Sequence, residues 1–112
     1  MRHIKASFDR MINQWHLSPV CTTIALPSEA AVQQIGTIDF LHLDGNFSEA
    51  GSLNDVKLYL PKVKEGGYIL LSNLFLMSNG KQPKLKSFSA LFDCCEMICE
   101  IEKDNAVLFR KQ

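Results

Sequence analysis

The sequence has no excess of charge of either sign, because 12 Lys and Arg residues balance 12 Asp and Glu residues. A neutral chain lacks the basic surface that attracts nucleic acids or anionic membranes, so we expect neither as a partner. It also lacks an apolar run close to the roughly 20 residues that a membrane-spanning helix needs. The N-terminal stretch MRHIKASFDRMINQWHL is interrupted too often by polar residues to be a secretory signal. We therefore expect a soluble, cytoplasmic protein.

The few cysteines show no metal-binding pattern. Cys21 stands alone, and Cys94, Cys95 and Cys99 lie within the stretch DCCEMICE. Adjacent cysteines and a C-x3-C spacing differ from the paired C-x2-C halves of a structural zinc site. We interpret all four as reduced thiols that pack as small hydrophobic side chains.

The length and composition are those of one packed domain. The chain has 112 residues, of which 46% are hydrophobic and 21% charged. This is enough for one domain and too little for two, so we expect a single domain over residues 1–112. Six lysines are scattered over a predicted helix and the loop after it, and we interpret them as solvated: Lys57, Lys62, Lys64, Lys81, Lys84 and Lys86.

The hydrophobic pattern alternates between the periods of helices and strands. Helices are expected over residues 4–16, from Ser28 as N-cap to about residue 35, and over residues 48–63 and 85–95. Strands are expected over residues 20–26, 37–44 and 68–72, and as a C-terminal hairpin of residues 97–101 and 106–110. The turn Glu65-Gly66-Gly67 should precede the strand at 68–72, and a loop should cover 73–83. This alternation predicts a layered α/β sheet with right-handed crossovers.

Residues 38–73, IDFLHLDGNFSEAGSLNDVKLYLPKVKEGGYILLSN, carry a recognisable pattern. A strand ends in the pair Asp44-Gly45, a helix follows with Pro61 near its end, and Gly66-Gly67 precedes the next strand. This resembles the second half of class I S-adenosylmethionine-dependent methyltransferases of the small O-methyltransferase type. The resemblance covers about residues 18–110. It implies a Rossmann-like, mostly parallel sheet that is truncated at its N-terminal side and ends in an antiparallel hairpin.

The same resemblance implies methyl transfer from S-adenosylmethionine to a small-molecule acceptor. The family holds that cofactor on a G-x-G-x-G loop after its first strand, where glycines let the backbone approach the ligand closely. The present chain has no such loop, and residues 20–26 correspond to the family's third strand. We therefore expect the chain alone to bind S-adenosylmethionine weakly or not at all and to be inactive. The alternative is a non-catalytic interaction or assembly module on the same fold.

The resemblance also points to Asp44 and Asn73 as catalytic and metal-binding candidates. In metal-dependent members of the family, an acid at the place of Asp44 binds a magnesium-like ion together with an Asp-Asn pair. Here the pair reads Ser72-Asn73, and one carboxylate with one amide makes a weak magnesium site. Asp44 would orient the acceptor or a metal, and Asn73 would assist. The alternative is that Asp44 only caps the following turn.

Two residues near Asp44 bear on the same candidate site. His42 lies two residues earlier and on the same face of the strand, where it is either a hydrogen-bonded core histidine or a catalytic base. Phe47 stands where many relatives have a histidine, and phenylalanine cannot transfer a proton.

The absence of the first two strands leaves one edge of the strand at residues 37–44 without a partner, and such edges pair readily with other chains. We expect residues 20–26 to close directly against this edge in a five-stranded sheet. A second copy could supply the partner instead, and a homodimer through the remaining apolar surface is expected as an addition.

Overall fold

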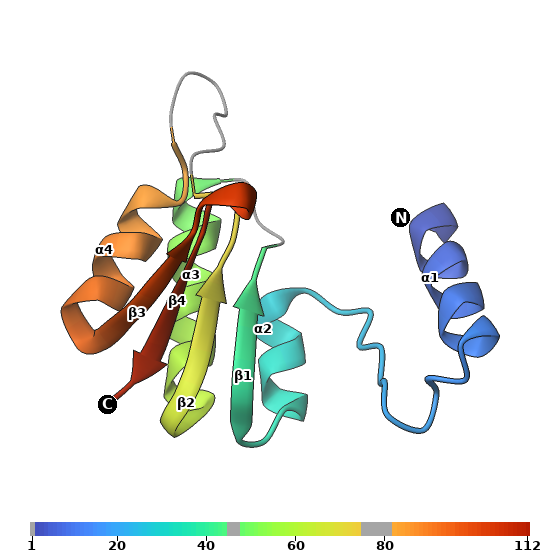
Figure 1. Ribbon diagram of the computed structural model, residues 1–112. Coiled ribbons are helices and arrows are strands. Elements are labelled where there is room, and N and C mark those ends of the chain that lie inside the picture. The colour runs from blue at the N-terminus through green and yellow to red at the C-terminus, as the bar shows by residue number, and fades with distance from the viewer. Residues whose placement is uncertain (1, 45–47, 75–81) are drawn as a thin grey trace.

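The computed structural model describes residues 2–44, 48–74 and 82–112, and its centre is one four-stranded sheet (Figure 1). The strand order is β1-β2-β4-β3. β1 (Ile38–Leu43) pairs in parallel with β2 (Val63–Leu71), and β4 (Ala106–Lys111) pairs antiparallel with both β2 and β3 (Cys95–Ile101). Three strands therefore run in one direction and β4 is reversed, which confirms the mostly parallel sheet with a C-terminal antiparallel hairpin.

Two helices cover one side of this sheet (Figure 1): α3 (Glu49–Tyr59) and α4 (Leu85–Cys94). α3 starts where the Ser48 hydroxyl accepts a hydrogen bond of 3.0 Å from the Gly51 N–H group. Such an N-cap provides an acceptor for a backbone N–H group that has no carbonyl partner within the helix. The core between helices and sheet contains Leu43, Val56, Val63, Ile69, Leu71, Leu74, Leu91, Cys95, Val107 and Phe109.

Both helices join the strands that follow them without a flexible loop. The predicted helix over residues 48–63 is interrupted at Pro61. α3 passes there into the short 3-10 turn η2 (Leu60–Lys62), and β2 begins at the next residue. α4 ends at Cys94 and β3 begins at Cys95.

β2 begins five residues earlier than predicted, so the expected turn at Gly66-Gly67 was wrong. Gly66 has a positive φ of 80°, which glycine adopts without strain. A Cβ atom on Gly67 would lie 2.8 Å from Val63 Cγ1 and 3.0 Å from the Asp39 carbonyl oxygen. The two glycines thus let β2 bend within the sheet and approach β1 closely, beside the register shift between Ile38 and Phe40.

β1 is covered on one face only, although its apolar residues on both faces are typical of a strand that is covered on each side. Leu43 faces the helices and is buried, whereas Phe40 is 55% exposed. The register places Phe40 beside Tyr68 and His42 beside Leu70. Side chains of paired residues point to the same face of a sheet. We call this second side the open face, and within the described residues no helix lies over it (Figure 1); its members are Phe40, His42, Tyr68, Leu70, Leu108 and Arg110.

Residues 20–26 form no strand, and this corrects the five-stranded sheet. Val20 is 80% exposed and Leu26 is 46% exposed. Their β-branched composition favours a strand only when a neighbouring strand pairs with it. In the part of the chain that the structure describes, β1 pairs with β2 alone, and residues 20–26 run away from its free edge (Figure 1).

The N-terminal helix was predicted correctly and corresponds to α1 (Arg2–Gln14). The second helix is shorter than expected, because α2 (Ser28–Ala31) continues only as the 3-10 turn η1 (Val32–Gln34). Pro27 rather than Ser28 occupies the N-cap, and no side chain caps it. Over residues 2–44, 48–74 and 82–112, no helix is both long and apolar enough to cross a bilayer.

Candidate functional site

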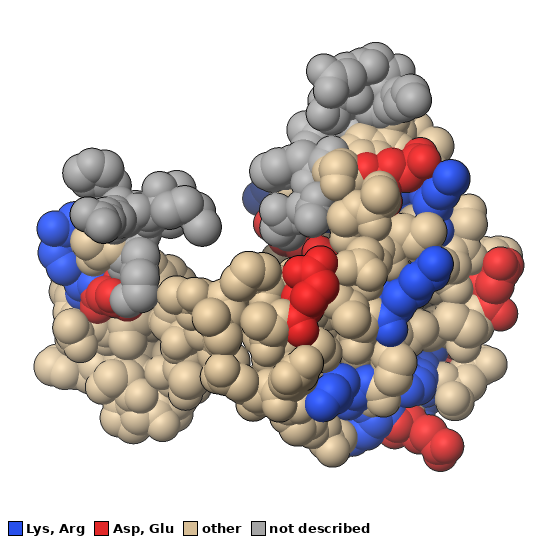
Figure 2. Space-filling model, turned by 180° about the vertical axis from the view of Figure 1, so that it is seen from behind, with Lys and Arg blue, Asp and Glu red and all other residues tan. Residues whose placement is uncertain are grey.

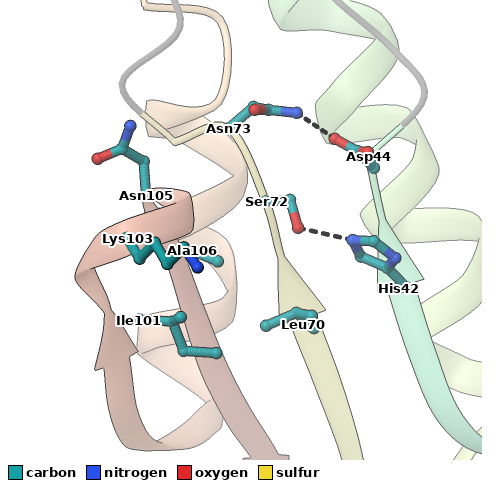
Figure 3. A pocket seen from close by; sticks show the side chains of 9 residues that line it. All are labelled: His42, Asp44, Leu70, Ser72, Asn73, Ile101, Lys103, Asn105 and Ala106. Atoms are coloured by element: carbon teal, nitrogen blue, oxygen red, sulfur yellow. Dashed lines mark hydrogen bonds between the residues drawn. The ribbon is translucent and has the colours of Figure 1, made fainter.

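Four polar side chains meet at the carboxyl ends of β1 and β2, and we call them the polar corner: His42, Asp44, Ser72 and Asn73 (Figure 3). The Asn73 side-chain amide donates a hydrogen bond to Asp44 Oδ1. His42 Nε2 lies 2.6 Å from Ser72 Oγ. The two predicted site residues, Asp44 and Asn73, are therefore neighbours, because parallel strands end at the same edge of a sheet.

The backbone around the polar corner is fixed on both sides. The Ser72 N–H group donates to the Leu43 carbonyl at 3.2 Å, which extends the pairing of β1 with β2. Asn73 then turns the chain with a positive φ of 57°. The next N–H group, of Leu74, donates at 2.9 Å to the carbonyl of Asn105, in the turn before β4.

The polar corner lines a pocket of about 460 Å³ together with residues from β2 and the β3–β4 turn (Figure 3): Leu70, Ile101, Lys103, Asn105 and Ala106. Lys103 and Asn105 were not predicted as site residues. β3 runs in the same direction as β1 and β2, so the turn that follows it lies at the same edge. The predicted hairpin could have indicated this, had the direction of its first strand been considered.

A second pocket, of about 400 Å³, adjoins the first and shares Ile101, Asn105 and Ala106 with it. Its remaining lining is largely apolar and comes from the end of β2, α4 and the hairpin: Leu74, Leu85, Phe88, Glu100, Glu102 and Val107.

Lys84 was interpreted as solvated, and this was wrong, because only 2% of it is exposed. It lies just before α4. Burial lowers the pKa of Lys84 below its usual value, while the negative charges of Asp44 and Asp55 act to raise it. A buried cationic side chain thus contributes positive charge around Asp44.

The polar corner fits a divalent cation poorly. Such ions need several oxygen ligands, and Asn73 turns its nitrogen rather than its oxygen toward Asp44. Among the described residues, no three His, Cys, Asp or Glu side chains converge as a metal site. The charge of Lys84 further opposes a second cation there. The metal role of Asp44 and Asn73 stays a prediction.

The residues present do not fit S-adenosylmethionine by themselves. The sequence contains no G-x-G-x-G segment. Among the described glycines, Gly66 and Gly67 shape β2, Gly51 lies inside α3 and Gly36 lies between η1 and β1, so no glycine-rich loop cradles a ligand there. Phe47 and most of the predicted loop at 73–83 lie outside the described residues.

The remaining site candidates have mixed outcomes. His42 is hydrogen-bonded as predicted but exposed, so it is not a core histidine. All four cysteines are free thiols. Cys95 is buried, and burial raises its pKa to about 11. Cys94 and Cys99 are exposed, so the prediction that they pack as small hydrophobic side chains was wrong for these two.

Comparisons with known proteins agree with this arrangement. Residues 2–74 match the model of a family described as "Methyltransferase domain". The solved structure of the O-methyltransferase NovP is similar, with a TM-score of 0.51 and 25% sequence identity over 70% of this chain. The matched part is 31% of the NovP chain, so this chain spans less than a third of that relative's length. No curated protein matches the chain.

Proposed function

Because the chain belongs to the methyltransferase domain family, we propose that its polar pocket holds the acceptor of a methyl group that S-adenosylmethionine supplies. One observation carries this proposal: the polar corner lies at the carboxyl ends of two adjacent parallel strands. Open α/β sheets hold their ligands at this edge. The similar solved structure is an O-methyltransferase, which supports a hydroxyl group as the acceptor.

The proposed chemistry needs a group that orients the acceptor hydroxyl and accepts its proton. An ionised carboxylate only accepts hydrogen bonds, so Asp44 suits this role. The amide of Asn73 holds one oxygen of that carboxylate, and we propose that the second oxygen meets the acceptor. The pair of His42 and Ser72 supplies further polar contacts on the same side of the pocket.

The two adjoining pockets indicate the shape of the acceptor. The first is lined mainly by polar groups, and the second by Leu74, Leu85 and Phe88 with two carboxylates at its border. A small molecule with a hydroxyl group at one end and an apolar or aromatic body fits both.

We propose that residues 1–112 do not bind the cofactor alone. When it is bound, S-adenosylmethionine supplies an electrophilic methyl group. The absence of a G-x-G-x-G segment and the coverage of only 31% of NovP support a division in which other residues hold the cofactor.

A non-catalytic assembly module on the same fold is the second candidate. The apolar open face favours it, since Phe40 and Tyr68 are 55% and 40% exposed. Exposed aromatic side chains side by side often mark an interaction surface.

Nuclear magnetic resonance titration of the ¹⁵N-labelled chain tests these proposals. Catechol, which has vicinal hydroxyl groups on an aromatic ring, should give saturable shifts at the amides of His42, Asp44 and Asn73. Asp44→Asn should weaken this binding about tenfold, because a charge-assisted hydrogen bond is lost. S-adenosylmethionine at millimolar concentration should give no saturable shift. Catechol shifts elsewhere, or no shift at all, would contradict the acceptor site and leave the assembly module.

A further inference from the structure

The N-terminal arm, residues 2–26, exposes large apolar side chains that no neighbouring element covers. α1 makes no extensive contact with another helix or strand in the described part of the chain (Figure 1). Figure 2 shows a deep gap between this arm and the rest of the molecule. The exposed fractions are 43% for Phe8, 42% for Met11, 66% for Trp15, 80% for Val20 and 46% for Leu26. Apolar surface of this extent marks an interaction site.

The open face and the edge of β1 form a second unpartnered surface. Leu43 uses its carbonyl group to bind Ser72, so the backbone groups of Leu43 point toward β2. Because these directions alternate along a strand, the N–H and C=O groups of Phe40 and His42 point to the free edge. β1 has no Pro or Lys, two residues that commonly protect an edge strand from pairing, and the charge of its Asp39 is paired with Lys64 at 3.0 Å.

Residues 20–26 resemble a missing edge strand, and the arm differs in net charge from the rest of the chain. Residues 20–26, VCTTIAL, are rich in β-branched residues and of similar length to the six-residue β1. Three of the 12 basic residues and one of the 12 acidic residues lie in residues 1–26. This stretch therefore carries a formal charge of +2, and residues 27–112 carry −2.

We propose that the chain forms a reciprocal dimer, in which the arm of each copy covers the β1 edge of the other and the part of its open face around Phe40 and Tyr68, beside the pocket that His42 and Leu70 line. The exposed Phe8 and Met11 of α1 pack over Phe40 and Tyr68 of the second copy. Residues 20–26 supply the strand that β1 lacks. Each copy gives and receives the same surface, so the assembly closes with two-fold symmetry. This inference does not depend on the proposed methyl transfer.

The attachment of the arm favours a second copy over closure on its own sheet. α2, where the arm begins, is fixed to α3 and η2: the Tyr59 hydroxyl donates to the Ser28 carbonyl at 2.9 Å, and Lys62 Nζ donates to the Ile35 carbonyl at 2.8 Å. The arm therefore starts near the helix-covered side, and residues 15–26 lead it away from its own β1 (Figure 1). To reach its own open face it would have to pass around the sheet edge.

Sedimentation velocity of the purified 112-residue chain tests the dimer. Wild type should sediment at about twice the monomer mass of 12.6 kDa. Trp15→Glu in the arm and Phe40→Glu on the open face should each weaken dimerisation about tenfold or more. Phe92→Glu is the matched control, because Phe92 on α4 is also 55% exposed but lies outside both surfaces. The proposal would be overturned if wild type sedimented as a monomer at about 200 μM, a concentration on the order of the dissociation constant of a weak transient contact. It would also be overturned if all three variants dimerised equally well.

Cross-linking separates the reciprocal dimer from closure within one chain. Cys21 lies in the arm, and Phe40→Cys places a second thiol on the open face; Cys94→Ser and Cys99→Ser remove the exposed thiols of the main body. Mild oxidation should give a covalent dimer on a non-reducing gel, and Cys21→Ser should abolish it. A disulfide found only within single chains would show that the arm closes on its own sheet, and no disulfide would show that it reaches neither.

Discussion

The side-chain amide of Asn73 donates a hydrogen bond to the carboxylate of Asp44, 29 residues earlier, and joins the ends of β2 and β1. Asn73 has a positive φ, a conformation that asparagine tolerates better than most residues. One residue thus turns the chain out of β2 and orients the carboxylate of the proposed acceptor site.

These two roles of Asn73 can be separated by substitution. Asn73→Gly keeps the backbone turn and loses the hydrogen bond, so the free energy of unfolding should fall by about 0.5–1.5 kcal/mol. Asn73→Ala also strains the backbone, so it should lower the free energy of unfolding by about 1 kcal/mol more than Asn73→Gly does. Urea denaturation of both variants, alone and with Asp44→Ala, measures this. If the effects of Asn73→Gly and Asp44→Ala simply add, the pair does not interact.

Magnesium should stabilise the wild-type chain very little. One carboxylate that faces an amide nitrogen, with Lys84 nearby, offers too few ligands for this ion. At a concentration of roughly 10 mM, Mg²⁺ should therefore raise the Tm by less than about 3 °C. Ser72→Asp restores a second carboxylate and should increase this shift. A large shift in wild type that Asp44→Ala removes would instead establish the magnesium site predicted from the sequence.

Lys84 should make stability depend on pH in the alkaline range. Its pKa is lowered in the folded chain, so the unfolded chain holds the proton more tightly. Stability therefore rises with pH between the folded pKa of Lys84 and its ordinary value of 10.5, as the burial penalty disappears.

Lys84→Met removes this charge and tests the effect. Its free energy of unfolding at pH 7 should equal that of wild type or exceed it by up to about 1 kcal/mol. The advantage should shrink toward pH 10.5. Raised pKa values of Tyr59 and Cys95 affect both proteins alike, so the difference between them isolates Lys84. A variant much less stable than wild type at pH 7 would show that attraction to Asp44 and Asp55 outweighs burial.

Gly67 should be intolerant of a side chain, because its Cβ would meet Val63 and the Asp39 carbonyl at 2.8 and 3.0 Å. Gly67→Ala should lower the free energy of unfolding by about 1–3 kcal/mol, since β2 must move away from β1. Gly36→Ala is the control, as nothing lies within 4 Å of its Cβ position. Equal thermal stabilities of the two variants would show that the close approach is unimportant.

The sequence predicted β1, the end of β2 and the hairpin correctly, because hydrophobic periodicity indicates such elements locally, and the alternation of helices and strands predicted the parallel direction of β1 and β2. It failed at Val20–Leu26, where strand propensity cannot show whether a pairing partner exists. It also did not show that the face of β1 with Phe40 and His42 is exposed, because an apolar strand has the same sequence pattern whether one or both of its faces are covered. Lys84 was missed for a related reason: burial of a lysine depends on the elements that fold around it.

Among the proposed site residues, Asp44 and Asn73 were identified through the resemblance to O-methyltransferases, and the structure makes them neighbours at the ends of β1 and β2. Lys103 and Asn105 join the site through the hairpin turn. The hydrophobic pattern predicted where this turn lies in the sequence, but not at which edge of the sheet it lies. Residues that meet only through the topology of the sheet carry no local signal.

The direct joins of α3 through η2 to β2 and of α4 to β3 have a mechanical consequence. With no slack between helix and strand, a displacement of either helix must be transmitted to its strand and so to the edge that carries Asp44 and Asn73. Insertions at these joins should be poorly tolerated. Residues 22–26 lie in neither a helix nor a strand, so in a chain that has not paired with a second copy proteases should cleave the backbone there first.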